Sequence, residues 1–358
     1  MNTPSTGLRV GLVGYGLAGA AFHAPLIATT PGLRLQSVVT ASPERREQLR
    51  REHSQARAVD TAEQLLADPD ALDLLVIASP NRTHVPLARA ALEAGLPVVV
   101  DKPLAATAAE AASLADLARE RGLLLTVFQN RRWDADFRTV RQLIDRGELG
   151  AVHRYESRFE RWRPQPGAGW RESADPAEVG GILYDLGSHL VDQALQLFGP
   201  AVRVHAEVDV RRPGALVDDD AFVALTHANG VRSHLWMSAL TGQLGPRLRV
   251  LGDRSAYVSH GLDPQEDALR AGRRPGPGWG EVPESGWGLL GTLDEARPHR
   301  PLPGDYPAFY AGVMAALRDG APAPVDPRDA VAALTVLEAA VRSAAEGRTV
   351  ALAEEVHA

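Results

Sequence analysis

The sequence predicts an α/β protein of two domains, a doubly wound parallel sheet followed by an α/β domain with an open, mostly antiparallel sheet. Short apolar runs alternate with helical segments up to residue 128, which is typical of a parallel sheet covered by helices on both faces. The pattern then changes to loosely alternating strands joined by tight turns. A chain of 358 residues is also long for one domain. We therefore expect domains at residues 1–128 and 129–358, with closing helices that can pack back on the first domain.

The first expected strand, residues 8–13, runs directly into a glycine-rich turn and then a helix at residues 20–28. The turn reads Gly14-Tyr15-Gly16-Leu17-Ala18-Gly19. In a dinucleotide-binding fold the first glycine makes the tight turn, the second admits the pyrophosphate, and the third lets helix and strand pack closely. Free N–H groups at the helix N-terminus then bind phosphate. The flanking strand and helix make the motif specific and predict a Rossmann domain, and the alternative is a turn without function.

The end of the second expected strand, residues 33–40, favours NADP(H) over NAD(H). A cofactor with a free ribose 2′-hydroxyl usually meets an acidic residue at this position. Here the strand ends in Thr40, Ser42 follows, and two arginines, Arg45 and Arg46, come next. Hydroxyl and guanidinium groups suit a 2′-phosphate. The same residues also fit a plain helix start, with Ser42 as N-cap before a proline, and both interpretations can hold together.

The remaining elements of the first domain continue the alternation. Capping boxes at 61–64 and 107–110 and a segment at 85–94 predict helices, and strands are expected at 72–78, 98–101 and 123–128. Two polar segments follow these strands, at residues 79–84 and 101–103. Active sites of open α/β sheets lie at the carboxyl ends of strands, so both segments are candidates for the site.

Lys102 stands out because it is the single lysine among 38 Lys and Arg residues. An ammonium is a compact point charge whose pKa can move into the working range, unlike that of a guanidinium. A run of valines ends at Asp101 directly before it, and a proline follows. One explanation is a surface lysine retained in an arginine-rich sequence. The strand-end position favours the other, a functional lysine.

In the second domain we expect a mostly antiparallel sheet with one long helix entering it. A helix is predicted at 137–145, strands at 152–159, 221–226, 231–238, 247–251 and 256–259, a surface loop at 272–288, and closing helices at 307–318 and 327–346. Asn229-Gly230 and Gly252-Asp253 are hairpin signals between four of these strands. Arginine pairs such as Arg131-Arg132, Arg211-Arg212 and Arg273-Arg274 are expected mostly on solvated surface.

A helical pattern from Leu183 onwards contains Asp185 and His189, which are four residues apart and so share a helix face. A carboxylate beside an imidazole fixes its orientation and favours its protonation, as in a general base. A buried histidine capped by a local acid explains the spacing equally well. Zinc needs more ligands than this stretch offers, so no metal is expected.

Composition excludes several classes of protein. The chain has no cysteine, which rules out disulfides and a cysteine nucleophile, and its net charge of −7 disfavours nucleic-acid and anionic-membrane partners. Residues 1–7 resemble no secretory signal, and no apolar run reaches bilayer length. We expect a cytoplasmic enzyme acting on a small molecule.

Three blocks together resemble the Gfo/Idh/MocA oxidoreductases. They are Gly14-x-Gly16-x-x-Gly19-x-x-x-His23-x-Pro25, Asp101-Lys102-Pro103, and Gly181-x-x-x-Asp185-x-Gly187-x-His189-x-x-Asp192. A narrower resemblance, to NADP-dependent scyllo-inositol dehydrogenases, rests on residues 129–134, 170–172, 183–189 and 261–267. The chain departs from the family pattern at Asp101, where glutamate is usual, and at Gln129, where histidine is frequent.

The resemblance implies that Lys102 and His189 are catalytic and that Asp185 holds substrate. The predicted cofactor site comprises Gly14, Tyr15, Gly16, Leu17, Ala18, Gly19, Thr40, Ser42, Arg45, Ser79, Asn81, His84, Asp101, Lys102, Asn130, Trp170 and Arg171. The expected reaction moves a hydride between NADP(H), or less readily NAD(H), and a secondary alcohol or ketone of a polyol or sugar. His189 would take the hydroxyl proton and Lys102 would stabilise charge on the oxygen.

Two other functions fit the same fold, an NADP-sensing regulator without turnover and a glycosidase that recycles bound nicotinamide. The family also implies an open sheet that is often a dimer surface, so we expect a homo-oligomer, either a dimer or a tetramer.

Overall fold

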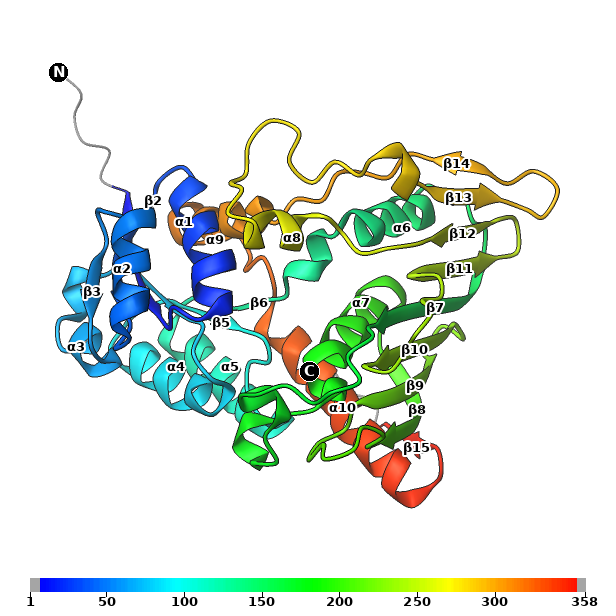
Figure 1. Cartoon of the computed structure of the whole chain (residues 1–358), viewed down its shortest axis with the longest axis horizontal. Helices are drawn as coiled ribbons and strands as arrows, with labels where there is room; N and C mark the ends of the chain where they lie inside the picture. Colours follow the sequence, from blue (N-terminus) through cyan, green and yellow to red (C-terminus); the bar gives the residue numbers. More distant parts are fainter. Residues whose placement is uncertain (1–6, 353–358) are drawn as a thin grey trace. The chain divides into compact units, whose positions relative to one another are not determined.

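The computed structural model describes residues 7–352, which form two compact units (Figure 1). The first unit extends to Asn130 and includes Gln265–Trp279 and Asp305–Ala330. The second comprises Arg131–Pro264, Gly280–Gly304 and the residues from Val331 onwards. Residues 1–6, which carry most of the prediction of no secretory signal, lie outside the described part.

The first unit is built on a six-stranded sheet whose strand pairs all run parallel. Its order is β3-β2-β1-β4-β5-β6, with β1 (Leu8–Val13), β2 (Leu33–Val39), β3 (Arg57–Val59), β4 (Leu74–Ile77), β5 (Val98–Asp101) and β6 (Leu125–Phe128). Every residue of β4 and β6 is buried, as expected of strands covered on both faces. The predicted doubly wound sheet is therefore confirmed. The strand order reverses between β1 and β4, which makes their carboxyl ends the expected ligand crevice.

Helices cover both faces of this sheet, with α4 and α5 below it and α1 and α9 above it in Figure 1. They are α1 (Ala24–Thr29), α2 (Pro43–Glu52), α3 (Ala62–Leu66), α4 (His84–Glu93), α5 (Ala108–Arg121), α8 (Gln265–Arg270) and α9 (Pro307–Asp319), with short turns η2 (Pro69–Ala71) and η3 (Asn81–Thr83). Thr107 and Glu110 form the predicted capping box of α5, and Gly122, at φ 64°, ends that helix.

The helix expected at residues 20–28 begins as a π-helix and continues as an α-helix. Residues Ala18–His23 form a π-helix, η1, before α1 begins, because the N–H of Ala24 bonds to the carbonyl of Gly19. Single π turns inside helices are frequent at functional sites.

The second unit contains a nine-stranded sheet in which only one neighbouring pair, β7 and β10, runs parallel. Its order is β14-β13-β12-β11-β7-β10-β9-β8-β15, with β7 (Val152–Glu160), β8 (Ala201–Asp209), β9 (Asp220–His227), β10 (Arg232–Ser238), β11 (Leu248–Gly252), β12 (Ala256–Ser259), β13 (Gly288–Gly291), β14 (Arg297–His299) and β15 (Val350–Ala351). The mostly antiparallel sheet and both predicted hairpins are confirmed.

Helix α7 (Ser188–Phe198) packs on β7 and β10, and α10 (Pro327–Glu346) lies on the same side (Figure 1). The other helices and turns are α6 (Ala135–Asp145), η4 (Asn130–Trp133), η5 (Trp170–Glu172), η6 (Pro176–Glu178), η7 (Leu183–Gly187) and η8 (Glu284–Gly286). On the opposite face of the sheet, the rings of Phe222 and Trp236 lie 5.1 Å apart, and Arg158 stacks 4.0 Å above Trp236.

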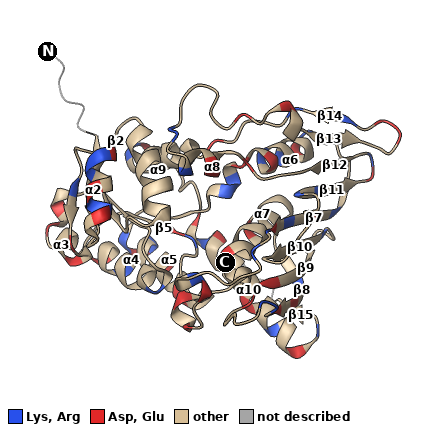
Figure 2. Ribbon diagram, viewed as in Figure 1, with Lys and Arg blue, Asp and Glu red and all other residues tan. Residues whose placement is uncertain are grey.

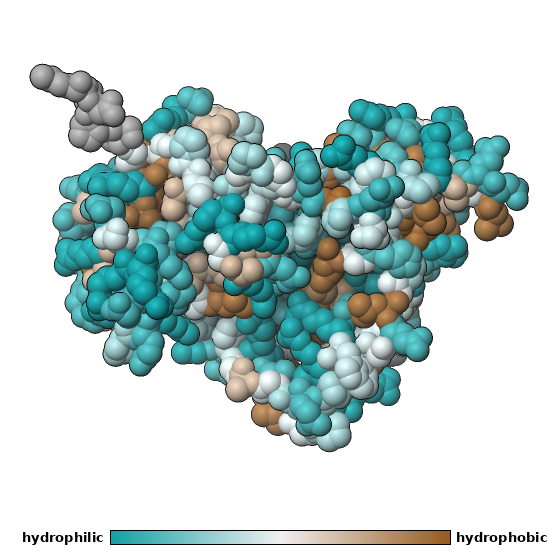
Figure 3. Space-filling model, turned by 45° about the horizontal axis from the view of Figure 1, so that its top comes forward, coloured by the Kyte–Doolittle hydropathy of each residue, from teal (hydrophilic) through white to brown (hydrophobic). Residues whose placement is uncertain are grey.

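Acidic and basic side chains are mixed on the helices, as on α2 in Figure 2, which agrees with the modest net charge of −7. The face drawn in Figure 3 is largely hydrophilic with scattered apolar groups. Among residues 7–352, every helix is too short or too polar to cross a bilayer.

The expectation that the arginine pairs are solvated is wrong at three positions. The side chains of Arg131, Arg132 and Arg212 are each less than a tenth exposed. Each is buried because a carboxylate compensates its charge: Asp134 for Arg131, Asp192 for Arg132 and Asp219 for Arg212.

Candidate active site

The three glycines after β1 differ in the space around them, and each matches one role of the dinucleotide motif. Gly14 has φ +97°, and a Cβ built there would lie 2.6 Å from the carbonyl oxygen of Ala78. A Cβ on Gly19 would lie 2.0 Å from the carbonyl oxygen of Gly14, so helix and strand pack too closely for any side chain. A Cβ built on Gly16 would meet nothing within 4 Å. The open side of Gly16 and the first turn of η1 therefore fit a pyrophosphate.

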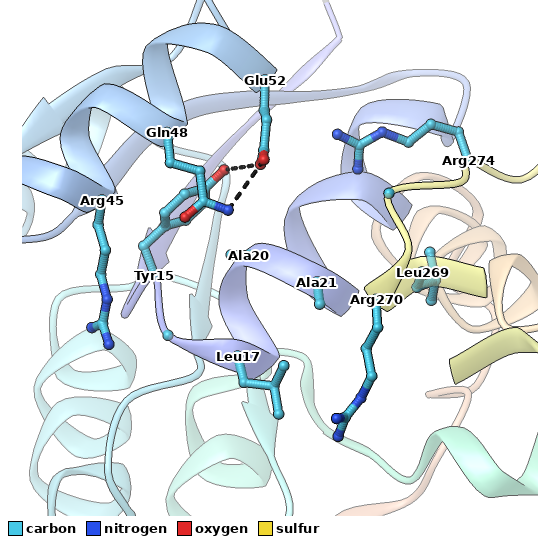
Figure 4. Close-up of a pocket in the computed structure, with 12 residues that line it drawn as sticks. Tyr15, Leu17, Ala20, Ala21, Arg45, Gln48, Glu52, Leu269, Arg270 and Arg274 are labelled. Carbon is cyan, nitrogen blue, oxygen red and sulfur yellow. Dashed lines mark hydrogen bonds between the residues drawn. The ribbon is translucent and has the colours of Figure 1, made fainter. Parts of the chain in front are cut away.

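A cavity of about 430 Å³ opens beside this turn, entirely within the first unit (Figure 4). Tyr15 and Arg45 line it from the nucleotide-binding half, and Arg270 and Arg274 line it from a segment that follows in the second half of the sequence. The Tyr15 hydroxyl donates to the carboxylate of Glu52 at 3.0 Å. Burial and the charge of Glu52 raise the pKa of Tyr15 well above its usual value, so its hydroxyl stays protonated.

The end of β2 contains the residues that the sequence assigned to the 2′-phosphate. Thr40 is buried, and Ser42 is the N-cap of α2, where its Oγ accepts from the N–H of Arg45 at 3.3 Å. The side chain of Arg46 is used differently, since its Nε donates to the carbonyl of Thr40 at 3.0 Å and its Nη2 pairs with Asp60. Arg45 is the arginine of this pair that lines the cavity.

His84 joins the two strand-end segments of the first unit. Its Nδ1 lies 2.7 Å from the carbonyl oxygen of Pro103, after β5, and its Nε2 lies 2.9 Å from that of Ser79, after β4. Burial lowers the pKa of His84, and a neutral ring donates to only one of the two carbonyls at a time. Ser79 and Thr83 share a hydrogen bond of 2.6 Å between their hydroxyls, and Asn81 is buried nearby in η3. His84, one of the predicted cofactor residues, therefore also holds the segment after β4 and the segment after β5, which contains Lys102, next to each other.

Lys102 is half-buried directly after β5, next to a polar cluster formed by Asp101, His23 and Tyr310. The Oδ1 of Asp101 accepts from the backbone N–H of Lys102 at 2.9 Å and lies 4.0 Å from Nε2 of His23. The ring of His23 is fully buried, and its Nδ1 lies 2.6 Å from the hydroxyl of Tyr310. Burial pushes the pKa of Asp101 up, but the neighbouring His23, Lys102 and His84 outweigh it, and the net pKa is below the usual value.

Tyr310 belongs to this cluster, although no motif or pattern in the sequence points to it. It lies on the largely apolar helix α9, 287 residues after His23. Another aromatic residue, Phe309, precedes it directly, so nothing in the helix sequence distinguishes Tyr310. His23 itself is part of the family motif, so only the partner was missed.

In the second unit, Asp185 lies in the π-helix η7 and His189 in the first turn of α7. The carboxylate of Asp185 accepts from Nε of Arg171 at 3.2 Å, and the guanidinium of Arg171 stacks 4.2 Å from the ring of Trp170. His189 is only 6% exposed. The structure thus brings together three of the predicted residues of this unit, Trp170, Arg171 and Asp185.

A buried ion-pair network supports the segment that carries Trp170 and Arg171. Asp219 accepts from Nε of Arg212 at 2.9 Å, and Nη2 of Arg212 donates to Glu172 at 2.9 Å. A small cavity of about 80 Å³ next to Asp185 is lined largely by charged side chains, including Arg161, Arg163 and Asp218. Among the described residues, no three His, Asp or Glu side chains lie close enough together to hold a metal ion.

Of the remaining predicted residues, Asn130 is buried at the start of η4, and Leu17 is exposed at the cavity. Ala18 begins η1.

Comparison with known proteins agrees with this geometry. Residues 8–129 match the model described as the oxidoreductase family, NAD-binding Rossmann fold, and residues 141–352 match that family's C-terminal alpha/beta domain. The chain is 42% identical over 353 residues to the uncharacterized oxidoreductase YdgJ of Escherichia coli, covering 98% of this chain and all of YdgJ. It is 36% identical over 351 residues to the scyllo-inositol 2-dehydrogenase (NADP(+)) IolW of Bacillus subtilis, covering 96% of each.

The solved structure of the yvaA protein from Bacillus subtilis superposes with a TM-score of 0.92 at 34% identity, covering 98% of this chain and all of that one. Two domain models and whole-length relatives above 30% identity agree. The chain therefore belongs to the Gfo/Idh/MocA oxidoreductase family and is an enzyme of the dehydrogenase type.

Proposed function

We propose that this protein is an NADP(H)-dependent dehydrogenase that interconverts a secondary alcohol and a ketone of a polyol or sugar, with scyllo-inositol as the leading substrate. The observation that carries the proposal is a glycine cradle opening on an arginine-lined cavity within the same unit as Lys102. The whole-length similarity to IolW, whose name gives both substrate and cofactor, supports the choice of inositol.

The predicted cofactor residues would form two groups, one that binds the phosphates and one that lines the nicotinamide half. The turn at Gly14 to Gly19 would hold the pyrophosphate, and Thr40, Ser42 and Arg45 would meet the adenosine 2′-phosphate. Ser79, Asn81, His84 and Asp101 would line the nicotinamide half, together with Lys102, Asn130, Trp170 and Arg171. Bound NADP⁺ supplies the carbon that accepts the hydride.

The protein residues would handle the proton and the charge. His189 takes the proton of the substrate hydroxyl as a general base. Lys102 donates a hydrogen bond to the same oxygen and stabilises negative charge that develops there. Asp185 orients the substrate or His189, and Arg171 holds its carboxylate in place. Reduction of the ketone uses the same groups in reverse.

Preference for NADP(H) is supported by the end of β2. Arg45 lines the cavity there, and the end of the strand, Thr40 to Ser42, has no acidic residue that would repel a phosphate. We also propose that the chain forms a homo-oligomer through the sheet face that carries Phe222 and Trp236. Paired aromatic rings on an uncovered sheet face are typical of interfaces.

The test is a panel of inositols and sugars assayed with NADP⁺ and with NAD⁺, following absorbance of the reduced nicotinamide. Turnover of scyllo-inositol or myo-inositol with a higher kcat/KM for NADP⁺ supports the proposal. Tight NADPH binding without turnover of any panel member would instead indicate a regulator. Release of sugar from a glycoside without net change in nicotinamide absorbance would indicate a glycosidase.

A further inference from the structure

A segment from the second half of the sequence forms one wall of the glycine-turn cavity. Helix α8 packs against η1, and its residues Ala268 and Leu269 are buried. Gln265, at its start, is 1% exposed, and its Oε1 accepts from Nε1 of Trp279 at 2.8 Å and from the N–H of Tyr306 at 2.7 Å. The segment is thus anchored as part of the first unit, and its side chains have fixed positions beside the cavity.

The lining of this cavity is strongly basic. Three of its lining residues, Arg45, Arg270 and Arg274, carry a guanidinium group, and one, Glu52, carries a carboxylate. This carboxylate already accepts from the Tyr15 hydroxyl at 3.0 Å and from Nε2 of Gln48 at 3.1 Å. A cavity of about 430 Å³ with this excess of positive charge selects an anionic ligand.

The guanidinium of Arg270 is held by one ion pair that uses only part of its hydrogen-bonding capacity. Its Nη2 pairs with Glu266, one helical turn earlier, at 2.7 Å. A guanidinium has five N–H donors, so further donors remain for a ligand. In Figure 4 the side chain of Leu17, next to the open Gly16, lies between the guanidinium groups of Arg45 and Arg270, while Arg274 extends at the other end of the cavity.

We propose that Arg270 is a further cofactor-binding residue, which closes the cavity from the wall opposite Arg45 and contacts the pyrophosphate of the dinucleotide. The inference rests on the dinucleotide site of the proposed function. Arg45, in the first turn of α2, meets the 2′-phosphate, so the two arginines bind different phosphates. Arg270 therefore contributes to affinity for NADP(H) and NAD(H) alike, whereas Arg45 contributes to the preference between them.

The test is equilibrium titration of the full chain and its variants with NADPH, NADH and adenosine 2′-monophosphate, which lacks a pyrophosphate. Arg270→Ala should raise the Kd of NADPH and of NADH by the same factor, about 10- to 100-fold, and leave that of adenosine 2′-monophosphate unchanged. Arg45→Ala should weaken NADPH and adenosine 2′-monophosphate but not NADH. Arg270→Lys should recover part of the affinity.

Arg273→Ala is the matched control, since this exposed arginine lies in the same segment but does not line the cavity. Its Kd values should equal those of the wild type, and an unchanged Tm of every variant shows that the fold is intact. Unchanged Kd values in Arg270→Ala, or a loss restricted to NADPH, would overturn the assignment of Arg270. A wild-type chain that binds NADPH but oxidises no polyol would contradict the proposed function and leave the assignment of Arg270 standing.

Discussion

The hydroxyl of Tyr310 lies 2.6 Å from Nδ1 of His23, and both side chains are completely buried. The opposite nitrogen of the ring, Nε2, faces Asp101 at 4.0 Å and has no hydrogen-bond partner of its own. Asp101 in turn accepts from the backbone N–H of Lys102. A chain of contacts therefore connects helix α9 to the proposed catalytic lysine, and Tyr310 holds the His23 ring on the side opposite Asp101.

A double-mutant cycle with Tyr310→Phe and His23→Ala tests this connection. Tyr310→Phe leaves a buried ring nitrogen without its partner, which should cost about 1–3 kcal/mol of unfolding free energy. Because both changes remove the same bond, their effects should fall short of additivity by about 1 kcal/mol in urea denaturation. Strict additivity would mean that the 2.6 Å contact contributes nothing to stability.

Gly16 and Gly19 should respond in opposite ways to alanine. In Gly19→Ala the new Cβ meets the carbonyl oxygen of Gly14 at 2.0 Å, so the backbone must shift, at a cost of about 1–3 kcal/mol of stability. In Gly16→Ala the Cβ meets nothing within 4 Å, so thermal stability of the chain without cofactor should stay unchanged. Its Kd for NADPH should still rise roughly tenfold, because the methyl group occupies the approach of the pyrophosphate.

Thermal unfolding with and without NADPH measures both effects in one experiment. A Gly16→Ala protein that binds NADPH normally would show that the cofactor does not approach this glycine.

The first unit could be predicted well because its signals are local. Parallel strands buried on both faces are continuous apolar runs, and the capping box at Thr107 and the left-handed Gly122 both follow from neighbouring residues. In the second unit, hairpins with explicit turn signals were predicted, but β8, at Ala201–Asp209, was not. Its valines at 202, 204 and 208 do alternate, and Gly199-Pro200 directly precedes the strand, but the charged residues between the valines, Arg203 and Glu207, resemble a loop.

Contacts between distant parts of the sequence could not be predicted. Arg270 and Tyr310 reach the nucleotide-binding half only because α8 and α9 fold back on it, and neither position has a local signal. Buried arginines such as Arg212 were expected at the surface, because the compensating carboxylate becomes visible only in the fold. The π-helix around Asp185 has no local signal either, because the apolar pattern from Leu183 fits regular α-helical spacing equally well.

Replacement of Lys102 or His189 should abolish turnover while leaving cofactor binding nearly intact. Lys102→Ala and His189→Ala are expected to lower kcat about 10²- to 10⁴-fold, because each removes a proton-transferring or charge-stabilising group. Lys102→Arg should not rescue activity, since a guanidinium differs from an ammonium in shape and acidity. His153→Ala, an exposed histidine on β7, is the control. Near-normal kcat in either alanine variant at Lys102 or His189 would refute its catalytic role.

Asp219 should make a contribution to stability that disappears in acid. Burial raises the pKa of this carboxyl. Hydrogen bonds from the backbone N–H groups of Arg211 and Arg212 and from the guanidinium of Arg212 lower it by a larger amount, so the net pKa is below the usual value. A carboxyl with a lowered folded-state pKa stabilises the protein above its unfolded-state pKa, about 3.9, and loses this effect as pH falls through the folded-state value.

Asp219→Asn should therefore reduce the unfolding free energy by about 3–5 kcal/mol at pH 7, because it leaves Arg212 buried without that partner. The difference from wild type should shrink as the pH falls below about 4. Asp220→Asn, its half-buried neighbour on β9, should cost less than about 1 kcal/mol at any pH, because its ion pair with Arg211 is largely in contact with solvent. Since Arg212 also holds Glu172, the Asp219 variant should raise the KM for the polyol through the Trp170–Arg171 segment. A stability difference that persists unchanged at pH 3 would show that the charge of Asp219 is not its source.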